Sequence, residues 1–518
     1  EPVPEVEPVP EVEPVPEVEP KVKKTRKLIV KSKVEPKAKK KLTLKKPQTF
    51  VDVLGETGVK KIIKKVPKKD KEIKIKASAY YLNNRKKFIQ FINTLFGKYT
   101  DSLEQTQESA SCEVDEDAPF TTMVHQQIVR DYINTYTPYR GVLLYHGLGS
   151  GKTCSSIAIA EGMKEKKKVI IMTPASLRRN YFEELKKCGD VLYRKNQHWE
   201  FEVLTNENLD TLSHVLFLPK EYITERGGAW LVDMDKPSNY EDLSMDNKLN
   251  IEEQVNMMID IKYKFISYNG MRKNHIDKLT QEYTINPFDN HVIVIDEAHN
   301  FVSRIVNKLG RDDTVSIQLY DMLMKANNAK IVLLSGTPMI NYPNELAIMF
   351  NIIRGYIYEY NYKIKVTGSK KIDTPYFTKL LNSRTTGGNL VDYIKYNPKT
   401  TTLSITRNPY GFVKKEKENV YMGMTMNERG EISEEDFKIN LIKILSKHKK
   451  DFELVRDEPV RSDYKLLPDN KEEFNQRYID PKTNLLLNPR QFKKRILGLT
   501  SYFRSAQESL MPNYTKGK

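Results

Sequence analysis

A glycine-rich turn between an apolar run and a helical run most constrains the fold of this chain. Residues 141–145, Gly-Val-Leu-Leu-Tyr, lead directly into His-Gly-Leu-Gly-Ser-Gly-Lys-Thr at 146–153, and a helical stretch follows at 154–163. In this order, backbone N–H groups and a helix N-terminus can surround a phosphate. The segment therefore predicts a phosphate loop, whose residues are His146, Gly147, Leu148, Gly149, Ser150, Gly151, Lys152 and Thr153.

Two residues of this loop are expected to carry chemistry. Lys152 would reach the β- and γ-phosphates of ATP, and Thr153 would ligate Mg²⁺. The strict pattern has Gly where this chain has His146, which weakens the motif slightly. An ordinary glycine-rich turn is the alternative, and the flanking strand and helix argue against it.

A second apolar run ends in two acids. Residues 292–295, Val-Ile-Val-Ile, precede Asp296 and Glu297, and ligands of open α/β sheets bind at the carboxyl ends of strands. We expect Asp296 to hold Mg²⁺ through water and Glu297 to orient and deprotonate the attacking water. The alternative is a helix whose first turn carries acids that complement its dipole. The position downstream of a phosphate loop favours the catalytic role.

The runs at 141–145 and 292–295 belong to a series of short apolar segments separated by helical stretches. The other members are 169–172, 264–266 and 331–334. Strands that are buried on both faces and alternate with helices predict a parallel sheet in an α/β fold. Residues 190–260 form a long insertion between two of these strands. Periodicity assigns no fold to the region from 355 to about 490, which is irregular and rich in Tyr, Lys and Asn.

The sequence Asp-Glu-Ala-His at 296–299 resembles the Walker B motif of superfamily 2 helicases. Further first-lobe motifs of that family occur in order at 125–126, 173–177, 267–269 and 335–338. The resemblance implies that Gln126 reads adenine, with Gln127 as the alternative. It also implies nucleic-acid contacts by Pro174, Ser176, Ser267 and Tyr268, and coupling of hydrolysis to movement through His299, Ser335 and Thr337.

The continuation at 339–346 resembles double-strand translocases of the Swi/Snf type and their relatives in large DNA viruses. The resemblance implies a RecA-like first motor lobe at 119–355, followed at 356–518 by an inserted or linking region. Residues 494–503 and 510–512 resemble the stretch that leads into the second lobe of poxvirus-like early transcription factor small subunits and viral nucleoside triphosphatases. An amphipathic helix is an equal alternative for this stretch.

The resemblance also implies a second lobe that supplies arginine fingers, and no such motif occurs in these residues. Arg407 resembles an element upstream of that lobe. The sequence, which begins with Glu, is expected to be part of a longer one, with the second lobe outside it. As given, the chain is expected to bind ATP and hydrolyse it slowly.

The N-terminal part has the composition of a disordered arm. Residues 1–20 repeat Glu-Pro-Val-Pro-Glu-Val and predict an extended spacer. Residues 21–76 contain 22 Lys or Arg against 5 Asp or Glu, with few aromatic residues, so we expect disorder. This arm either binds nucleic acid or directs localisation, or it is a solvated linker. A helical segment and an acidic linker are expected at 77–118.

The bulk properties suggest an intracellular, soluble protein. No run of 18 apolar residues occurs, so no membrane association is expected, and a virion or viral factory is a possible location. The three cysteines, Cys112, Cys154 and Cys188, are far apart in sequence, so neither a disulfide framework nor a zinc site is expected. The net charge of +17 suits a polyanionic partner, although solvated lysine-rich faces explain it equally well.

Our leading hypothesis is an ATP-dependent helicase or translocase that acts on nucleic acid in viral transcription. DNA is favoured over RNA, ATP and Mg²⁺ are the cofactors, and a viral RNA polymerase or transcription complex is a candidate partner. The alternative is a transcription initiation or termination factor that ATP switches without strand separation. A third hypothesis, a phosphate-loop ATPase unrelated to nucleic acid such as a chaperone-like ring, is disfavoured by the motifs at 296–299 and 335–338.

Overall fold

The computed structural model describes ten stretches of the chain: residues 96–100, 123–133, 139–147, 149–163, 167–311, 313–381, 391–407, 412–417, 420–426 and 434–503. The regions expected to be disordered, at 1–20 and 21–76, lie outside these residues, as does most of 77–118. Within 96–100 the chain forms η1 (Gly97–Tyr99). All described residues belong to one compact unit. None of the described helices is both long enough and apolar enough to cross a membrane.

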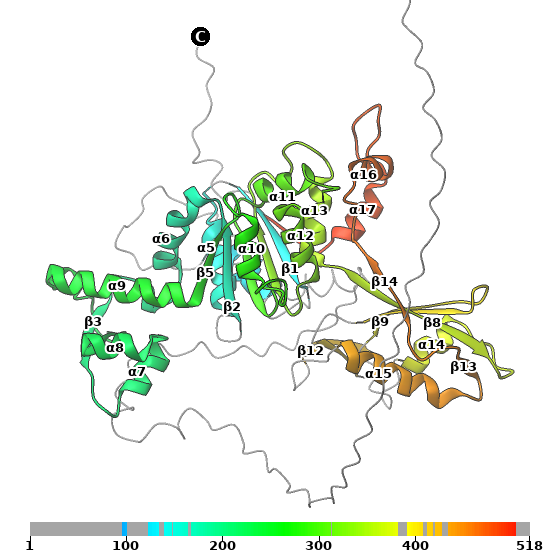
Figure 1. Ribbon diagram of the computed structural model, residues 1–518, viewed down its shortest axis with the longest axis horizontal. Helices are drawn as coiled ribbons and strands as arrows, with labels where there is room; N and C mark the ends of the chain where they lie inside the picture. The colour runs from blue at the N-terminus through cyan, green and yellow to red at the C-terminus, as the bar shows by residue number, and fades with distance from the viewer. Residues whose placement is uncertain are drawn as a thin grey trace, which may run out of the picture. The chain divides into compact units, whose positions relative to one another are not determined.

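The larger of the two main sheets has six strands and is flanked by helices (Figure 1). Its strands are β1 (Gly141–His146), β2 (Lys168–Thr173), β5 (Tyr263–Ser267), β6 (His291–Ile295), β7 (Lys330–Leu334) and β15 (Thr500–Phe503). Their spatial order is β15-β1-β7-β6-β2-β5, and every neighbouring pair is parallel. The prediction of a parallel α/β sheet is therefore confirmed.

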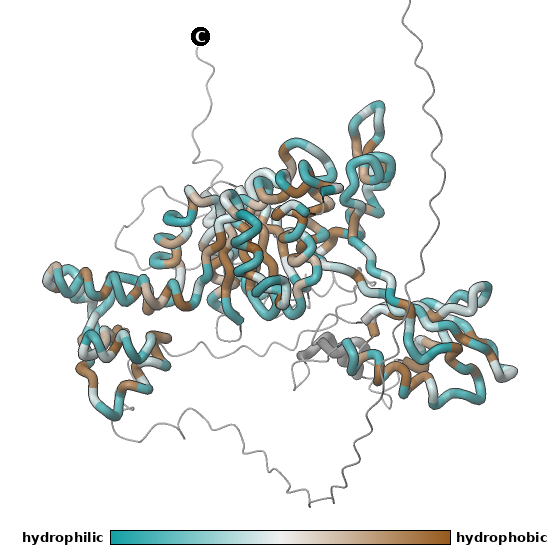
Figure 2. The backbone as a smooth tube through the Cα atoms, in the orientation of Figure 1, coloured by the Kyte–Doolittle hydropathy of each residue, from teal (hydrophilic) through white to brown (hydrophobic). Residues whose placement is uncertain are grey.

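The sheet is buried because its strands are apolar on both faces. The side chains of Val292, Ile293, Val294 and Ile295 are fully buried, and these strands form the hydrophobic centre in Figure 2. In the parallel register Leu144 of β1 lies beside Leu334 of β7, and Ile295 of β6 lies beside Met172 of β2. The segments that follow these four strands therefore emerge at one edge of the sheet.

Helices connect and cover the strands. They are α4 (Val124–Asp131), α5 (Lys152–Glu161), α6 (Arg178–Cys188), α10 (Lys273–Leu279), α11 (Ala298–Val306), α12 (Val315–Lys325) and α13 (Glu345–Arg354), and η3 (Ala175–Leu177) precedes α6. α5 packs against both α4 and α6, whereas α11, α12 and α13 pack against one another.

The insertion between β2 and β5 is an ordered subdomain. It contains η4 (Val191–Tyr193), β3 (His198–Val203), α7 (Leu209–Leu216), α8 (Lys220–Arg226), β4 (Gly228–Asp233), η5 (Tyr240–Asp242) and α9 (Met245–Lys262). β3 and β4 form an antiparallel pair. The Gln254 side chain ties α9 to β4, because it bonds to both the N–H and the carbonyl oxygen of Trp230, at 2.9 and 2.8 Å.

The region to which periodicity assigned no fold contains a second sheet with its own core. Its elements are β8 (Ile357–Val366), α14 (Thr374–Leu381), β9 (Val391–Asn397), β10 (Thr402–Arg407), α15 (Glu434–Leu445), η7 (Ser446–His448), β13 (Phe452–Leu454) and β14 (Val460–Tyr464). A separate hairpin, β11 (Phe412–Lys417) and β12 (Val420–Met426), lies between β10 and α15 in sequence.

The connectivity of this second sheet is a β-α-β-β-α-β pattern. The elements follow one another as β8, α14, β9, β10, α15 and β13, and the strands lie in the order β13-β8-β10-β9 with antiparallel neighbours. This is the topology of the ferredoxin-like split β-α-β fold. The core joins inward strand residues such as Tyr360 and Leu403 to Phe377 of α14 and Phe437 of α15. Both helices therefore cover the same face of the sheet. We call this module, residues 357–454, the plait.

After β14 the chain packs again on the hydrophobic core of the six-stranded sheet. α16 (Lys471–Tyr478) and α17 (Pro489–Ile496) bury Phe474, Tyr478 and Phe492 in the cluster that contains the six-stranded sheet. β15 follows and pairs with β1 along its length. The first lobe predicted from the sequence ends at residue 355. Residues 500–503 nevertheless complete its sheet, a long-range pairing that local sequence patterns do not encode.

Candidate nucleotide-binding site

The glycine-rich loop leaves β1 after His146 and enters α5 at Lys152. Gly149 and Gly151 have φ angles of 72° and 69°, which only glycine adopts without strain. A Cβ atom at Gly151 would overlap the side-chain amide of Gln126. No side chain caps the N-terminus of α5, so its first N–H groups are available to an anion.

The side chain of Lys152 lies over this loop. Its Nζ donates to the carbonyl oxygens of His146 and Gly147, each at 3.2 Å. Ser150 Oγ donates to the same Gly147 oxygen at 2.7 Å. A cationic amine and a helix N-terminus thus converge on one loop, an arrangement suited to a phosphate group. Leu148, also predicted to belong to the loop, lies outside the described residues.

His146, which occupies the position of the missing first glycine, ends β1 and is fully buried. A hydrogen bond of 2.9 Å joins its Nε2 to Ser501 Oγ of β15. Burial, together with the nearby His125 and Lys152, lowers the pKa of His146 to about 4. The imidazole is therefore neutral near pH 7. The His146 ring lies beneath the phosphate loop and, because it is neutral, adds no positive charge to the site.

Helix α4 carries the predicted glutamine to the loop. Gln126 is buried, and its Nε2 donates to the carbonyl oxygen of Gly151 at 3.3 Å. The preceding His125 donates from Nε2 to the carbonyl oxygen of Ser150 at 2.8 Å. The ring of His125 also stacks on that of Phe503, with centroids 4.1 Å apart. His125 and Phe503 belong to motifs noted in the sequence, but their contact was not predicted, because it joins distant parts of the chain.

The two acids lie where β6 ends, at the edge from which the loop also leaves its strand. Asp296 Oδ1 accepts a hydrogen bond of 3.0 Å from the backbone N–H of Glu297. Glu297 has a left-handed backbone with φ of 46°, uncommon for a residue other than glycine. Burial and the charge of Glu297 raise the pKa of Asp296 to about 6, although the hydrogen bond from the Glu297 N–H and the charge of Lys152 oppose the shift.

The Asp296 carboxylate and the Thr153 hydroxyl, both predicted to be metal ligands, offer the hard oxygen atoms that Mg²⁺ prefers. The partly buried Asp296 carboxylate is held near the amine of Lys152 and carries an unfavourable negative charge. A divalent cation would compensate that charge. The residues present therefore fit a magnesium–nucleotide complex.

A series of polar contacts connects the acids to the loop after β7. His299 Nδ1 lies 3.4 Å from Glu297 Oε2 and 3.0 Å from Ser335 Oγ. Ser335 Oγ also accepts from the N–H of Thr337 at 3.1 Å. A Cβ atom built on Gly336 would lie 3.8 Å from Lys152 Nζ. The three residues predicted to couple hydrolysis to movement therefore lie together beside the phosphate loop.

The four residues predicted to contact nucleic acid differ in exposure. Ser176 is exposed in η3, whereas Pro174 is buried. Ser267 Oγ is buried and forms no hydrogen bond with the described residues. Tyr268 is only 4% exposed, and its hydroxyl donates to the carbonyl oxygens of Asp296 and Glu297 at 3.0 and 3.1 Å. In this structure Tyr268 thus supports the acidic pair and presents no surface to a nucleic acid.

Helices α5 and α6 bring two cysteines together. Cys154 and Cys188 form a disulfide with a Cα–Cα distance of 5.4 Å. No disulfide framework was expected from the sequence, and this pair is a single disulfide between two helices. The two cysteines are 34 positions apart in the sequence, and only the packing of α5 on α6 brings them together. The Glu184 carboxylate lies 3.5 Å from Cys154 Sγ and 3.7 Å from Cys188 Sγ.

Comparison with known proteins relates this site to a family. Residues 124–366 match the family model of the SNF2-related domain. The chain is 30% identical over 268 residues to "Putative ATP-dependent RNA helicase R563" of Acanthamoeba polyphaga mimivirus, covering 51% of this chain and 38% of that protein. It is 26% identical to "Putative helicase 087L" of Invertebrate iridescent virus 3, covering 45% of this chain and 20% of that protein.

A further relative has a transcription-related name. The chain is 28% identical over 218 residues to "Termination factor NPH-I homolog" of African swine fever virus, covering 42% of this chain and 23% of that protein. The matched segment thus spans less than two fifths of each of these three relatives. Residues 124–366 contain the phosphate loop, the acidic pair and the loop after β7. This part of the chain matches the SNF2-related domain family.

Proposed function

We propose that this chain contains the ATP-binding motor lobe of a nucleic-acid-dependent ATPase, a helicase or translocase that acts on DNA in viral transcription. The observation that carries the proposal is the convergence of Lys152, the Asp296–Glu297 pair and the His299–Ser335 hydrogen bond at one edge of the sheet. The match to the SNF2-related domain family supports ATP as the substrate.

Each residue has a role that follows from its position. Lys152 and the first N–H groups of α5 would bind the β- and γ-phosphates. Thr153 and Asp296 would hold Mg²⁺, which neutralises phosphate charge when bound. Glu297 would accept a proton from the attacking water. Its left-handed backbone and the Tyr268 hydroxyl hold the acidic pair in one orientation.

The coupling role is proposed for the loop after β7. Ser335 is bonded to His299, whose ring also contacts Glu297. If nucleic-acid binding moves this loop, the movement would therefore be transmitted to Glu297 through the imidazole of His299. Gln126, held against Gly151, is proposed to read the adenine. Transcription is proposed because one relative is named a termination factor.

The central experiment measures ATP hydrolysis by the chain with and without duplex DNA and duplex RNA. The variant Glu297→Gln is expected to retain ATP binding and to lose about 10²–10⁴-fold in turnover, the usual contribution of a general base. Lys152→Ala is expected to lose ATP binding itself. If Glu297→Gln keeps the full stimulated rate, the proposed catalytic base is wrong.

A second candidate function is an ATP-switched termination factor that never separates strands, which the name of the African swine fever virus relative favours. A tailed-duplex displacement assay distinguishes the two. Robust unwinding would eliminate the switch, whereas ATP-dependent release of a transcript without unwinding would favour it.

A further inference from the structure

The plait presents one face of its sheet that its own helices do not cover. Side chains alternate along β8, and Tyr360, Tyr362 and Ile364 point into the core with α14 and α15. The residues between them therefore lie on the opposite face. We call this the open face. It carries Glu359, Asn361, Lys363 and Lys365 of β8, Thr402, Ser404 and Thr406 of β10, Tyr393, Lys395 and Asn397 of β9, and Glu453 of β13. β14, which also pairs with β8, extends this face with Val460, Ser462 and Tyr464.

The strand register arranges these residues in rows. Lys363 lies beside Thr402, which lies beside Asn397, and in the next row Asn361, Ser404 and Lys395 are aligned. Asn361 accepts a hydrogen bond from Ser404 Oγ at 2.6 Å. The centre of the open face is thus a flat hydroxyl and amide surface with lysines around it.

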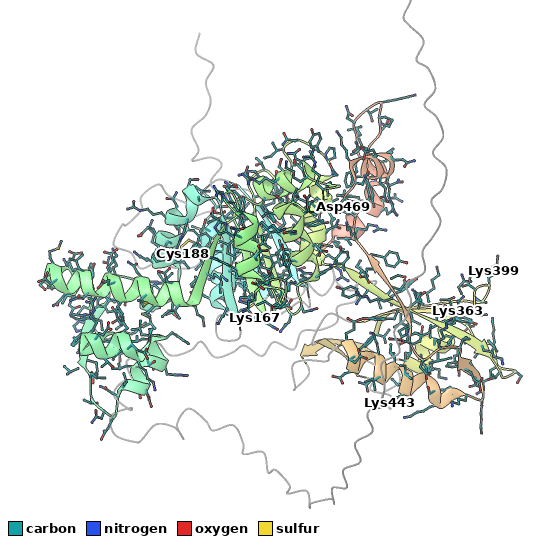
Figure 3. The ribbon with its side chains drawn as sticks, in the orientation of Figure 1. Lys167, Cys188, Lys363, Lys399, Lys443 and Asp469 are labelled. Atoms are coloured by element: carbon teal, nitrogen blue, oxygen red, sulfur yellow. A yellow bond between two sulfur atoms is a disulfide. The ribbon has the colours of Figure 1, made fainter. Side chains whose placement is uncertain are left out.

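Four lysines give this surface a positive charge. Lys363, Lys365 and Lys395 are exposed on the strands, and Lys399 is exposed in the turn between β9 and β10. None of the four forms an ion pair with another described residue, and Lys363 Nζ donates to the carbonyl oxygen of Thr400 at 2.8 Å. Among the described side chains of this face, only Glu359 and Glu453 are carboxylates. Figure 3 labels Lys363 on β8, Lys399 in the turn between β9 and β10, and Lys443 on α15.

The chemistry of the face indicates the kind of partner. Unpaired lysines beside hydroxyl and amide groups match a phosphate backbone. Proteins that bind single strands on a sheet stack bases on aromatic side chains. The outward residues of β8 and β10 named above include no aromatic side chain, and the two outward tyrosines, Tyr393 and the exposed Tyr464, lie on the flanking strands β9 and β14. A duplex, whose bases are already stacked, therefore fits this face better than a single strand.

We infer that the open face of the plait is a second nucleic-acid contact surface, which binds the phosphate backbone of duplex DNA. The inference deepens the proposed function and rests on it, because it identifies the partner of the same ATPase. The contact is independent of base sequence, since lysine–phosphate contacts carry no sequence information.

The test compares two triple variants of the full chain. Lys363→Gln, Lys365→Gln and Lys395→Gln remove charge from the open face. Lys443→Gln, Lys447→Gln and Lys449→Gln remove the same charge from exposed positions of α15, η7 and the residue after η7. All six positions are exposed, so equal melting temperatures are expected. We expect the open-face variant to bind duplex DNA about tenfold more weakly at ~100 mM salt, with a shallower salt dependence.

Lysine acetylation with and without DNA maps the contact directly. Duplex DNA should protect the four open-face lysines and leave Lys443, Lys447 and Lys449 reactive. Equal affinity loss in both variants, or no protection of the open face, would overturn the inference. Protection by duplex RNA or single strands in preference to DNA would also overturn it, as would protection only by a protein partner.

The two proposals fail separately. ATP turnover without DNA should be unchanged in the open-face variant, because none of its lysines lies at the phosphate loop. If DNA protects the lysines but never stimulates hydrolysis, the surface stands and the proposed ATPase coupling fails. If DNA stimulates hydrolysis equally in both variants and leaves the lysines reactive, the ATPase stands and the surface fails.

Discussion

Phe503 stacks on His125, with ring centroids 4.1 Å apart and ring planes 10° apart. The contact joins β15 to α4, and His125 in turn donates to the carbonyl oxygen of Ser150 in the phosphate loop. The backbone carbonyl of Phe503 accepts from the N–H of Gly147 at 2.9 Å. A strand from the far end of the described chain therefore holds the loop at two points.

Removal of this stack should weaken nucleotide binding. Phe503→Ala is expected to raise the KM for ATP up to about tenfold with a smaller change in kcat, because an aromatic pair contributes about 0.5–1.5 kcal/mol. Phe503→Tyr should restore the KM. Tyr502→Ala is the matched control, since Tyr502 is 60% exposed on the same strand. An equal rise in KM for Tyr502→Ala would indicate a general effect of β15 instability.

The hydrogen bond between His299 and Ser335 should transmit the effect of nucleic acid. Ser335→Ala removes it along with the bond from the Thr337 N–H. We expect unstimulated hydrolysis to fall by less than about fivefold, since a hydrogen bond contributes about 1 kcal/mol. Stimulation by nucleic acid should be largely lost. Steady-state ATPase assays over a range of DNA concentrations would reveal this, and unchanged stimulation would contradict it.

The disulfide between Cys154 and Cys188 should stabilise the lobe. Closing a loop of this length contributes at most about 4 kcal/mol in the chain-entropy model. Cys188→Ser, or reduction of the wild type, is therefore expected to lower the melting temperature by a few degrees. Thermal unfolding with and without a reducing agent measures the effect. Cys112→Ser should remain sensitive to the reducing agent, whereas Cys188→Ser should not.

The buried His146 should make stability depend on pH. Its pKa is lowered to about 4, mainly by burial, whereas an unfolded histidine has a pKa of about 6.5. Between these values the unfolded state binds the additional proton, so acid favours unfolding. The contribution of His146 is full above pH ~6.5 and falls by about 3 kcal/mol as the pH drops to ~4.

The substitution His146→Gln should reduce this loss of unfolding free energy at acid pH. Urea unfolding of the wild type and the variant at several pH values would measure the difference. A residual slope is expected from His125, whose pKa burial also lowers. Parallel pH profiles for the two proteins would show that His146 does not titrate in this range.

Much of the site could be predicted from local sequence. Lys152 follows a strand and begins a helix, and Asp296 and Glu297 follow a run of four buried residues. Parallel strands place their carboxyl ends at one edge of the sheet, so contiguous motifs sufficed to predict that these residues converge. The plait was missed although β8 alternates tyrosine or isoleucine with polar residues from Tyr358 to Lys365. Its pairings link segments up to about a hundred residues apart.

The sequence by itself determined which short segments form strands, which turn can hold a phosphate and which acids end a strand, because those properties depend on neighbouring residues. Tertiary structure alone decided that Ser501 contacts His146, that Cys154 meets Cys188, and that the Tyr268 hydroxyl faces the acidic pair and not solvent. Each of these contacts joins residues that are distant in sequence. Only packing of the whole lobe, which satisfies buried polar groups and fills the core, brings such residues together.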